Sequence, residues 1–86
     1  MKNKSFIGID ISKNVIDVSI FCEGTPIKDF PHDVFNNSRK GFGEMCTWLK
    51  KKHVVLSNCL FGMEFTGSYS MELEKFLNAR KYQFCM

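Results

Sequence analysis

The sequence predicts an α/β fold built on a mixed five-stranded sheet with strand order 3-2-1-4-5. Short apolar runs of strand length alternate with polar turns, and two stretches with helical spacing separate the last three runs. The predicted element order is β-β-β-α-β-α-β. A helical crossover returns the chain parallel to an earlier strand with right-handed chirality, and the best neighbour for the fourth strand is the first, because both are rich in apolar residues.

The first three strands form a meander. Residues 5–11 are almost continuously apolar, which is typical of a strand buried on both faces. Residues 15–22 alternate, and the polar link at residues 12–14 between these runs suits a hairpin. A second turn signal at residues 23–26 leads into a weaker third strand over residues 27–35.

A helix is expected next, because Ser38 is a plausible N-cap and apolar residues recur at helical spacing, namely Phe42, Met45, Cys46 and Leu49. The cationic run at residues 50–52 suits its C-terminus, whereas Gly41 and Gly43 weaken its first turn. A fourth strand over residues 58–65 precedes a second helix. That helix is opened by residues 66–68 and has an apolar face formed by Tyr69, Leu73, Phe76 and Leu77. The fifth strand is residues 82–86.

Size and composition allow one small domain. The chain has 86 residues, 44% of them hydrophobic and 24% charged, with a net charge of +3 that permits contact with nucleic acid without requiring it. The four cysteines have no C-x-x-C spacing, and no apolar run reaches transmembrane length, so a reduced cytoplasmic protein is expected. The sequence stops inside an apolar strand, and we therefore expect a fragment of a longer protein.

Two carboxylates interrupt apolar strands. Asp10 lies within the first strand and Glu64 within the fourth, each with a glycine two positions earlier, Gly8 and Gly62. Side chains alternate along a strand, so each glycine shares a face with its acid and would leave open space beside it. If the two strands are parallel neighbours about 4.8 Å apart, both acids lie near the C-terminal ends and could converge on one ion.

Such a pair favours a divalent metal. Two acids in near-apolar surroundings repel each other unless a cation compensates, and oxygen ligands favour Mg²⁺ or Mn²⁺ over zinc. Ions of this kind activate water in phosphodiester cleavage. The alternative is that each acid merely ends its strand and faces solvent, but two matched acids on neighbouring strands favour a functional pair.

Two segments resemble a known family. The stretch at residues 6–13, F-I-G-I-D-I-S-K, followed by Asp17 and Val18, is similar to the opening of the DEDD transposases of the insertion-sequence 110 family. The stretch at residues 63–69, M-E-F-T-G-S-Y, resembles that family's M-E-A-T-G-S-Y segment, with Phe65 in place of alanine. Asn37 and the pair at residues 41–42 fit the middle segment, whereas Lys81 stands where the family usually has glycine.

The resemblance implies an RNase H-like (RuvC-like) fold that binds Mg²⁺ or Mn²⁺ through four acids. Asp10 matches the first acid and Glu64 the second, as catalytic and metal-binding residues. The other two acids and a C-terminal domain would lie beyond residue 86, so this fragment alone is expected to be inactive. The implied function is metal-dependent DNA cleavage and rejoining in transposition. The implied partners are DNA, a structured guide RNA and further copies of the chain, with no membrane.

Other polar residues have less specific roles. Lys13 is a candidate contact to a DNA phosphate or an exposed turn lysine. Thr66 and Ser68 are expected to cap the second helix or to orient Glu64. We expect Asp17 on the solvent side or in a local pair rather than as a metal ligand, and Tyr69 in the core.

Two other functions remain open from the residues. The first half of an actin-like or sugar-kinase domain would also begin with a strand, an acid and a hairpin, but its hairpin usually carries a glycine, which residues 11–13 lack. A non-catalytic module that self-associates through an open sheet edge is the third possibility.

Overall fold

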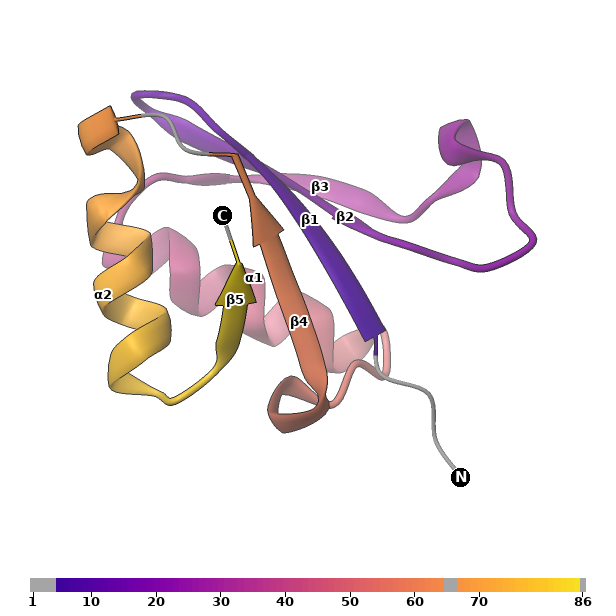
Figure 1. Cartoon of the computed structure of the whole chain (residues 1–86). Helices are drawn as coiled ribbons and strands as arrows, with labels where there is room; N and C mark the ends of the chain where they lie inside the picture. Colours follow the sequence, from indigo (N-terminus) through magenta and orange to yellow (C-terminus); the bar gives the residue numbers. More distant parts are fainter. Residues whose placement is uncertain (1–4, 65–66, 86) are drawn as a thin grey trace.

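In the computed structural model, which describes residues 5–64 and 67–85, a five-stranded sheet carries the helices α1 and α2, as the ribbon shows (Figure 1). The elements in chain order are β1 (Ser5–Ile11), β2 (Val15–Ile20), η1 (Ile27–Asp29), β3 (His32–Asn36), α1 (Arg39–Lys51), η2 (Leu56–Asn58), β4 (Cys59–Met63), η3 (Gly67–Ser70), α2 (Met71–Ala79) and β5 (Gln83–Cys85), where η marks a short 3-10 helix. The strand order is β3-β2-β1-β4-β5, which confirms the predicted mixed sheet.

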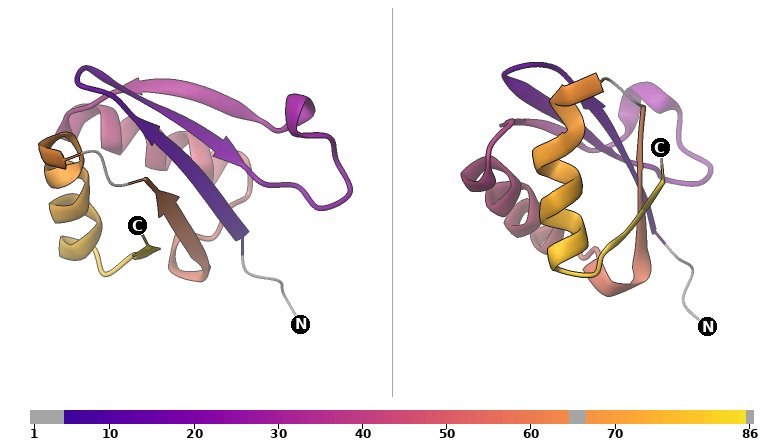
Figure 2. Two further views of the ribbon diagram at one scale, coloured as in Figure 1. Left: turned by 45° about the horizontal axis from the view of Figure 1, so that its top comes forward. Right: turned by 60° about the vertical axis from the view of Figure 1, so that its left-hand side comes forward.

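Strand directions follow from the connections. The β1–β2 and β2–β3 pairs are antiparallel, as a meander requires, and the β1–β4 and β4–β5 pairs are parallel. Both crossovers, through α1 and through α2, therefore advance in the same direction across the sheet. Right-handed crossovers that advance in one direction place their helices on the same face. Both helices accordingly cover one face of the sheet (Figure 2).

The core lies between that face and the helices. Alternate strand residues point into it and are buried, among them Ile7, Ile9, Ile16, Val18 and Phe61. The opposite face of β1 is open, and Phe6 on it is 50% exposed. The prediction that the first strand is buried on both faces is therefore wrong, because no helix of the described residues covers the second face.

Helix α1 begins and packs as predicted. Ser38 is the N-cap, and its Oγ accepts a hydrogen bond from the Gly41 backbone N–H at 3.2 Å. Four apolar residues at helical spacing are buried, namely Phe42, Met45, Cys46 and Leu49. Lys50 and Lys51 occupy the last turn, where cations are favourable. Trp48 packs against Phe35, with ring centroids 5.7 Å apart.

Strand β3 is shorter than predicted. Residues 27–29 form a 3-10 turn in place of a strand, and the Asp29 and Phe30 N–H groups donate to the carbonyls of Pro26 and Ile27. Pro31 has no N–H to donate to the sheet, so the ladder with β2 begins only at His32. Ile27 is 82% exposed, which shows that the segment does not contribute to the core.

The second helix also differs at its start. It begins at Met71 after the 3-10 turn η3, and Leu73 and Leu77 on its inner face are fully buried. Tyr69 lies in η3 and is 46% exposed, so its predicted place in the core is wrong. Ser70, not Ser68, is the N-cap residue, and its Oγ donates to Glu74 Oε2 at 2.7 Å. Thr66 and Phe65 lie outside the described residues.

The remaining strand ends are close to the prediction. Strand β2 ends at Ile20, leaving Cys22 half-buried beyond it, and β5 covers residues 83–85, with Met86 outside the described residues. None of the four cysteines, all of which lie within the described ranges, forms a disulfide. No helix in these ranges is long and apolar enough to span a membrane.

Candidate functional site

The two predicted acids occupy equivalent positions on neighbouring strands, at one end of the sheet. In the parallel β1–β4 pair, Gly8 is opposite Gly62 and Ile9 is opposite Met63. Asp10 and Glu64 each follow the last of these paired residues, at the C-terminal ends of neighbouring strands. Adjacent strands are about 4.8 Å apart, so the topology brings the two acids together as predicted.

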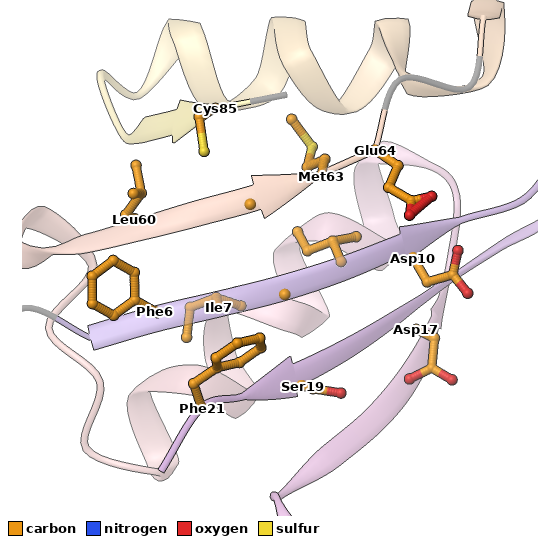
Figure 3. Close-up of a pocket in the computed structure, with 13 residues that line it drawn as sticks. Phe6, Ile7, Asp10, Asp17, Ser19, Phe21, Leu60, Met63, Glu64 and Cys85 are labelled. Carbon is orange, nitrogen blue, oxygen red and sulfur yellow. The ribbon is translucent and has the colours of Figure 1, made fainter. Parts of the chain in front are cut away.

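Both carboxylates face the open side of the sheet. They line a shallow groove of about 970 Å³ on the face opposite the helices. Asp10, Asp17 and Glu64 lie at one end of this groove, and Phe6, Phe21, Leu60 and Cys85 lie toward the other (Figure 3). Asp10 and Glu64 are exposed, so the expectation of near-apolar surroundings is wrong for the carboxylates themselves. The apolar neighbours in the sequence point to the opposite face.

The two glycines differ in what lies above them. A Cβ atom at Gly62 would meet nothing closer than the Ile7 carbonyl oxygen at 3.9 Å, so the space beside Glu64 is open as predicted. A Cβ atom at Gly8 would lie 2.9 Å from Cε1 of Phe21, whose ring covers the glycine. The prediction of open space beside both acids therefore holds for Gly62 and is wrong for Gly8.

Asp17 is a third acid on this surface. It lies directly opposite Asp10 in the antiparallel β1–β2 pair and is half-buried. Residues directly opposite in such a pair have Cβ atoms about 5 Å apart, and like charges there repel. The sequence reasoning placed Asp17 on the solvent side, which is correct, but did not anticipate that it would share the groove with the other two acids. The signal was available in the hairpin register, because a turn between residues 11 and 16 pairs residue 10 with residue 17.

In the part of the chain that the structure describes, the acids of the groove have no ion-paired cation. Within residues 5–64 and 67–85, no lysine or arginine forms an ion pair with Asp10, Asp17 or Glu64. Nor does any group of three metal-ligating side chains in these ranges come close enough to hold a metal ion. The arrangement is therefore a negatively charged end of an open groove, with two carboxylates level on parallel strands and a third beside them.

Lys13 occupies the hairpin that follows Asp10. Its side chain is exposed, in a turn closed by the Ser12 N–H and Oγ, which both donate to the Val15 carbonyl. Both interpretations of Lys13, as a phosphate contact and as an exposed turn lysine, are compatible with this position. Ser68 is also exposed.

The chain is similar to proteins that rearrange DNA. Residues 7–86 match the family model of the insertion-sequence 110 DEDD proteins, described as "Transposase". Two curated relatives, each named pilin gene-inverting protein, come from Moraxella bovis and Moraxella lacunata. Each is 33% identical to this chain over 67 residues, which are 78% of this chain and 20% of the relative. The alignment thus covers about a fifth of each relative's length. The family match extends over nearly all of the sequence, and the chain therefore belongs to the DEDD transposase family of the insertion-sequence 110 type.

Proposed function

We propose that this chain contributes two metal-binding carboxylates, Asp10 and Glu64, to an RNase H-like domain that cleaves and rejoins DNA strands in transposition. One observation carries the proposal: the two acids end neighbouring parallel strands at the same level and on the same open face. Ligands bind preferentially at the carboxyl ends of parallel strands. The relatives named pilin gene-inverting protein support DNA as the substrate.

The donor set suits a hard divalent cation. Carboxylate oxygens are the ligands that Mg²⁺ and Mn²⁺ prefer, and the open space beside Gly62 leaves room next to Glu64. Three acids without an ion-paired partner in the described ranges form a local negative potential that a cation would neutralise. Two acids do not complete a metal site. The family's third and fourth acids, expected beyond residue 86, would supply the missing ligands.

Bound divalent ions would supply an activated water and stabilise the leaving oxygen of the phosphodiester. The residues of this chain would bind and orient those ions, with Asp10 and Glu64 as the ligands. Lys13 follows Asp10 in the adjoining hairpin and would contact a phosphate of the DNA backbone. The guide RNA and the homo-oligomer that the resemblance implies stay predictions.

A Mn²⁺ titration followed by NMR tests the metal-binding step. Mn²⁺ is paramagnetic, so we expect it to broaden the amide signals of the wild-type chain next to both Asp10 and Glu64 at the same, high concentration. Asp10→Asn and Glu64→Gln should each abolish the shared broadening. Glu44→Gln, which removes an exposed acid on α1 at the other face of the sheet, is the matched control and should change nothing. Broadening that survives in both site variants would contradict the proposal.

Two further assays separate the alternatives. We expect no DNA cleavage by the 86-residue chain alone, because Asp10 and Glu64 are only two of the four acids that the family resemblance implies. Robust Mg²⁺-dependent cutting by this chain would contradict that expectation. A kinase-type site would bind Mg-nucleotide, and we expect none, since the hairpin at residues 12–14 has no glycine to cradle phosphate.

A further inference from the structure

Asn37 connects three segments of the chain by hydrogen bonds. It lies between the end of β3 and the N-cap of α1, and its backbone N–H donates to the Asn14 carbonyl at 2.9 Å. Its side-chain Nδ2 donates to the Ser12 carbonyl at 2.9 Å and to the Tyr69 carbonyl at 3.0 Å. The two side-chain acceptors are 25 and 32 residues away in sequence. A single nitrogen atom therefore ties together two distant turns.

Both of these turns follow an acid of the site. Ser12 comes two residues after Asp10, and Tyr69 comes five residues after Glu64. A neutral primary amide can donate two hydrogen bonds from one nitrogen, which a hydroxyl or a carboxylate cannot do. The Asn37 amide is thus a direct link between the segment that follows β1 and the segment that follows β4.

The amide is held in one orientation by these donor bonds. The Asn37 Oδ1 atom is buried and has no hydrogen-bond partner among the described residues. Turning the amide over would aim that oxygen at the two carbonyl oxygens, which is unfavourable because no hydrogen would lie between them. The two hydrogen bonds that Nδ2 donates therefore fix the orientation of the Asn37 amide.

The backbone that carries Asn37 is itself fixed. The Ser38 N–H donates to the Asn36 carbonyl at 2.9 Å, and the first turn of α1 lies so close to Asn36 that only a glycine fits at position 41. The amide is therefore presented by a strand end and a helix start rather than by a free loop. Groups presented by such elements hold a site more accurately than groups on loops.

We propose that Asn37 is a positioning residue that sets the placement of Asp10 relative to Glu64. The inference rests on the proposed function, because it assumes that the two acids share a divalent ion. Residues that orient metal ligands typically affect metal affinity by about ten- to hundredfold when they are removed. We expect a loss of that size on removing the Asn37 amide.

The test uses Mn²⁺ alone as the probe and the full 86-residue chain. In Asn37→Ala we expect Mn²⁺ affinity to fall by about tenfold or more, with the signals next to Asp10 and Glu64 broadening at different Mn²⁺ concentrations. Asn37→Asp has the same shape, lacks both donors and adds a carboxylate. If the residue acted only through charge, this variant would bind Mn²⁺ more tightly. A positioning role predicts weaker binding instead. Asn36→Ala, at an exposed neighbour of the same type, is the control and should match the wild type.

Amide hydrogen exchange without metal separates this inference from the proposed function. In Asn37→Ala, exchange near Ser12 and near Tyr69 should accelerate together, whether or not the wild type binds Mn²⁺. Unchanged exchange and unchanged Mn²⁺ affinity in a folded variant would overturn the inference. If the variants do not fold, side-chain amide exchange in the wild-type chain provides the test. Both Nδ2 hydrogens of Asn37 should exchange far more slowly than those of the exposed Asn78. Equal exchange rates would refute the link through Asn37. Absence of Mn²⁺ binding by the wild type would count against the proposed function alone.

Discussion

Replacing Gly41 with alanine tests how closely helix α1 is seated on strand β3. An alanine Cβ at this position would overlap the Asn36 carbonyl oxygen and would lie 2.7 Å from its carbonyl carbon. These are backbone atoms, so they cannot rotate away as the end of a side chain could. Gly43, one half-turn further along the same helix, offers a matched control, because a Cβ there would meet nothing within 4 Å.

The two substitutions should change the free energy of unfolding in opposite directions. Alanine is favoured over glycine in a helix by about 1 kcal/mol, so Gly43→Ala should stabilise the protein by about 0.5–1 kcal/mol. Gly41→Ala gains the same propensity, but forcing atoms into a filled space costs about 1–3 kcal/mol. Moving the helix start would also strain the bond from the Gly41 N–H to Ser38, and a lost N-cap costs about 1 kcal/mol. A net destabilisation of about 1–3 kcal/mol follows.

Urea denaturation followed by circular dichroism measures both effects. A domain of this size is expected to have a total stability of about 5–10 kcal/mol, so the Gly41→Ala midpoint should fall substantially while the Gly43→Ala midpoint rises. The slope of the transition should remain unchanged if both variants keep the native fold. An equal rise in stability for the two variants would refute the close approach of α1 to Asn36.

Three further predictions concern single residues. Asp17→Asn should stabilise the metal-free protein by about 0.5 kcal/mol, because it removes like-charge repulsion with Asp10, and the gain measured by thermal unfolding should shrink at 1 M salt. Lys81 has a φ of 61°, a left-handed conformation that costs a non-glycine residue about 1 kcal/mol. Lys81→Gly should therefore stabilise the protein by about 0.5 kcal/mol in urea, whereas Lys81→Ala should not. Burial raises the pKa of the Cys46 thiol, so its thiolate forms only at a higher pH than usual. Alkylation followed by mass spectrometry should therefore modify the exposed Cys85 well before Cys46 as the pH rises from 7 to 9, and similar rates would contradict the buried position.

Local patterns predicted most of the fold. The bounds of β1, the N-cap at Ser38 and the buried face of α1 all follow from residue spacing, since periodicity records which side chains turn inward. The strand order followed from connection rules. The third strand was predicted too early, because apolar residues near Ile27 resemble a strand although residues 27–29 form a 3-10 turn and Pro31 has no N–H to donate to the sheet.

The site was predictable only in part. The position of Asp10 beside Glu64 follows from the direction and order of the strands, and the sequence indicated both. The Phe21 ring above Gly8 and the bonds from Asn37 are long-range contacts, and no local pattern encodes them. The exposure of Tyr69 had no signal either, because its helical spacing with Leu73 continues through the 3-10 turn.

The short segment at residues 36–41 affects both the stability of the fold and the geometry of the candidate site. The Asn36 carbonyl lies under Gly41, and the next residue, Asn37, holds the turns after β1 and β4. A displacement of α1 would therefore move the Asn37 amide as well. We expect Gly41→Ala to weaken Mn²⁺ binding in conditions where it remains folded, although no carboxylate is altered, and Gly43→Ala to leave binding unchanged. The Mn²⁺ affinities should be measured by NMR without urea, at a temperature well below the unfolding midpoints of both variants. Equal affinities for the two variants would show that the position of the helix start does not affect the placement of the acids.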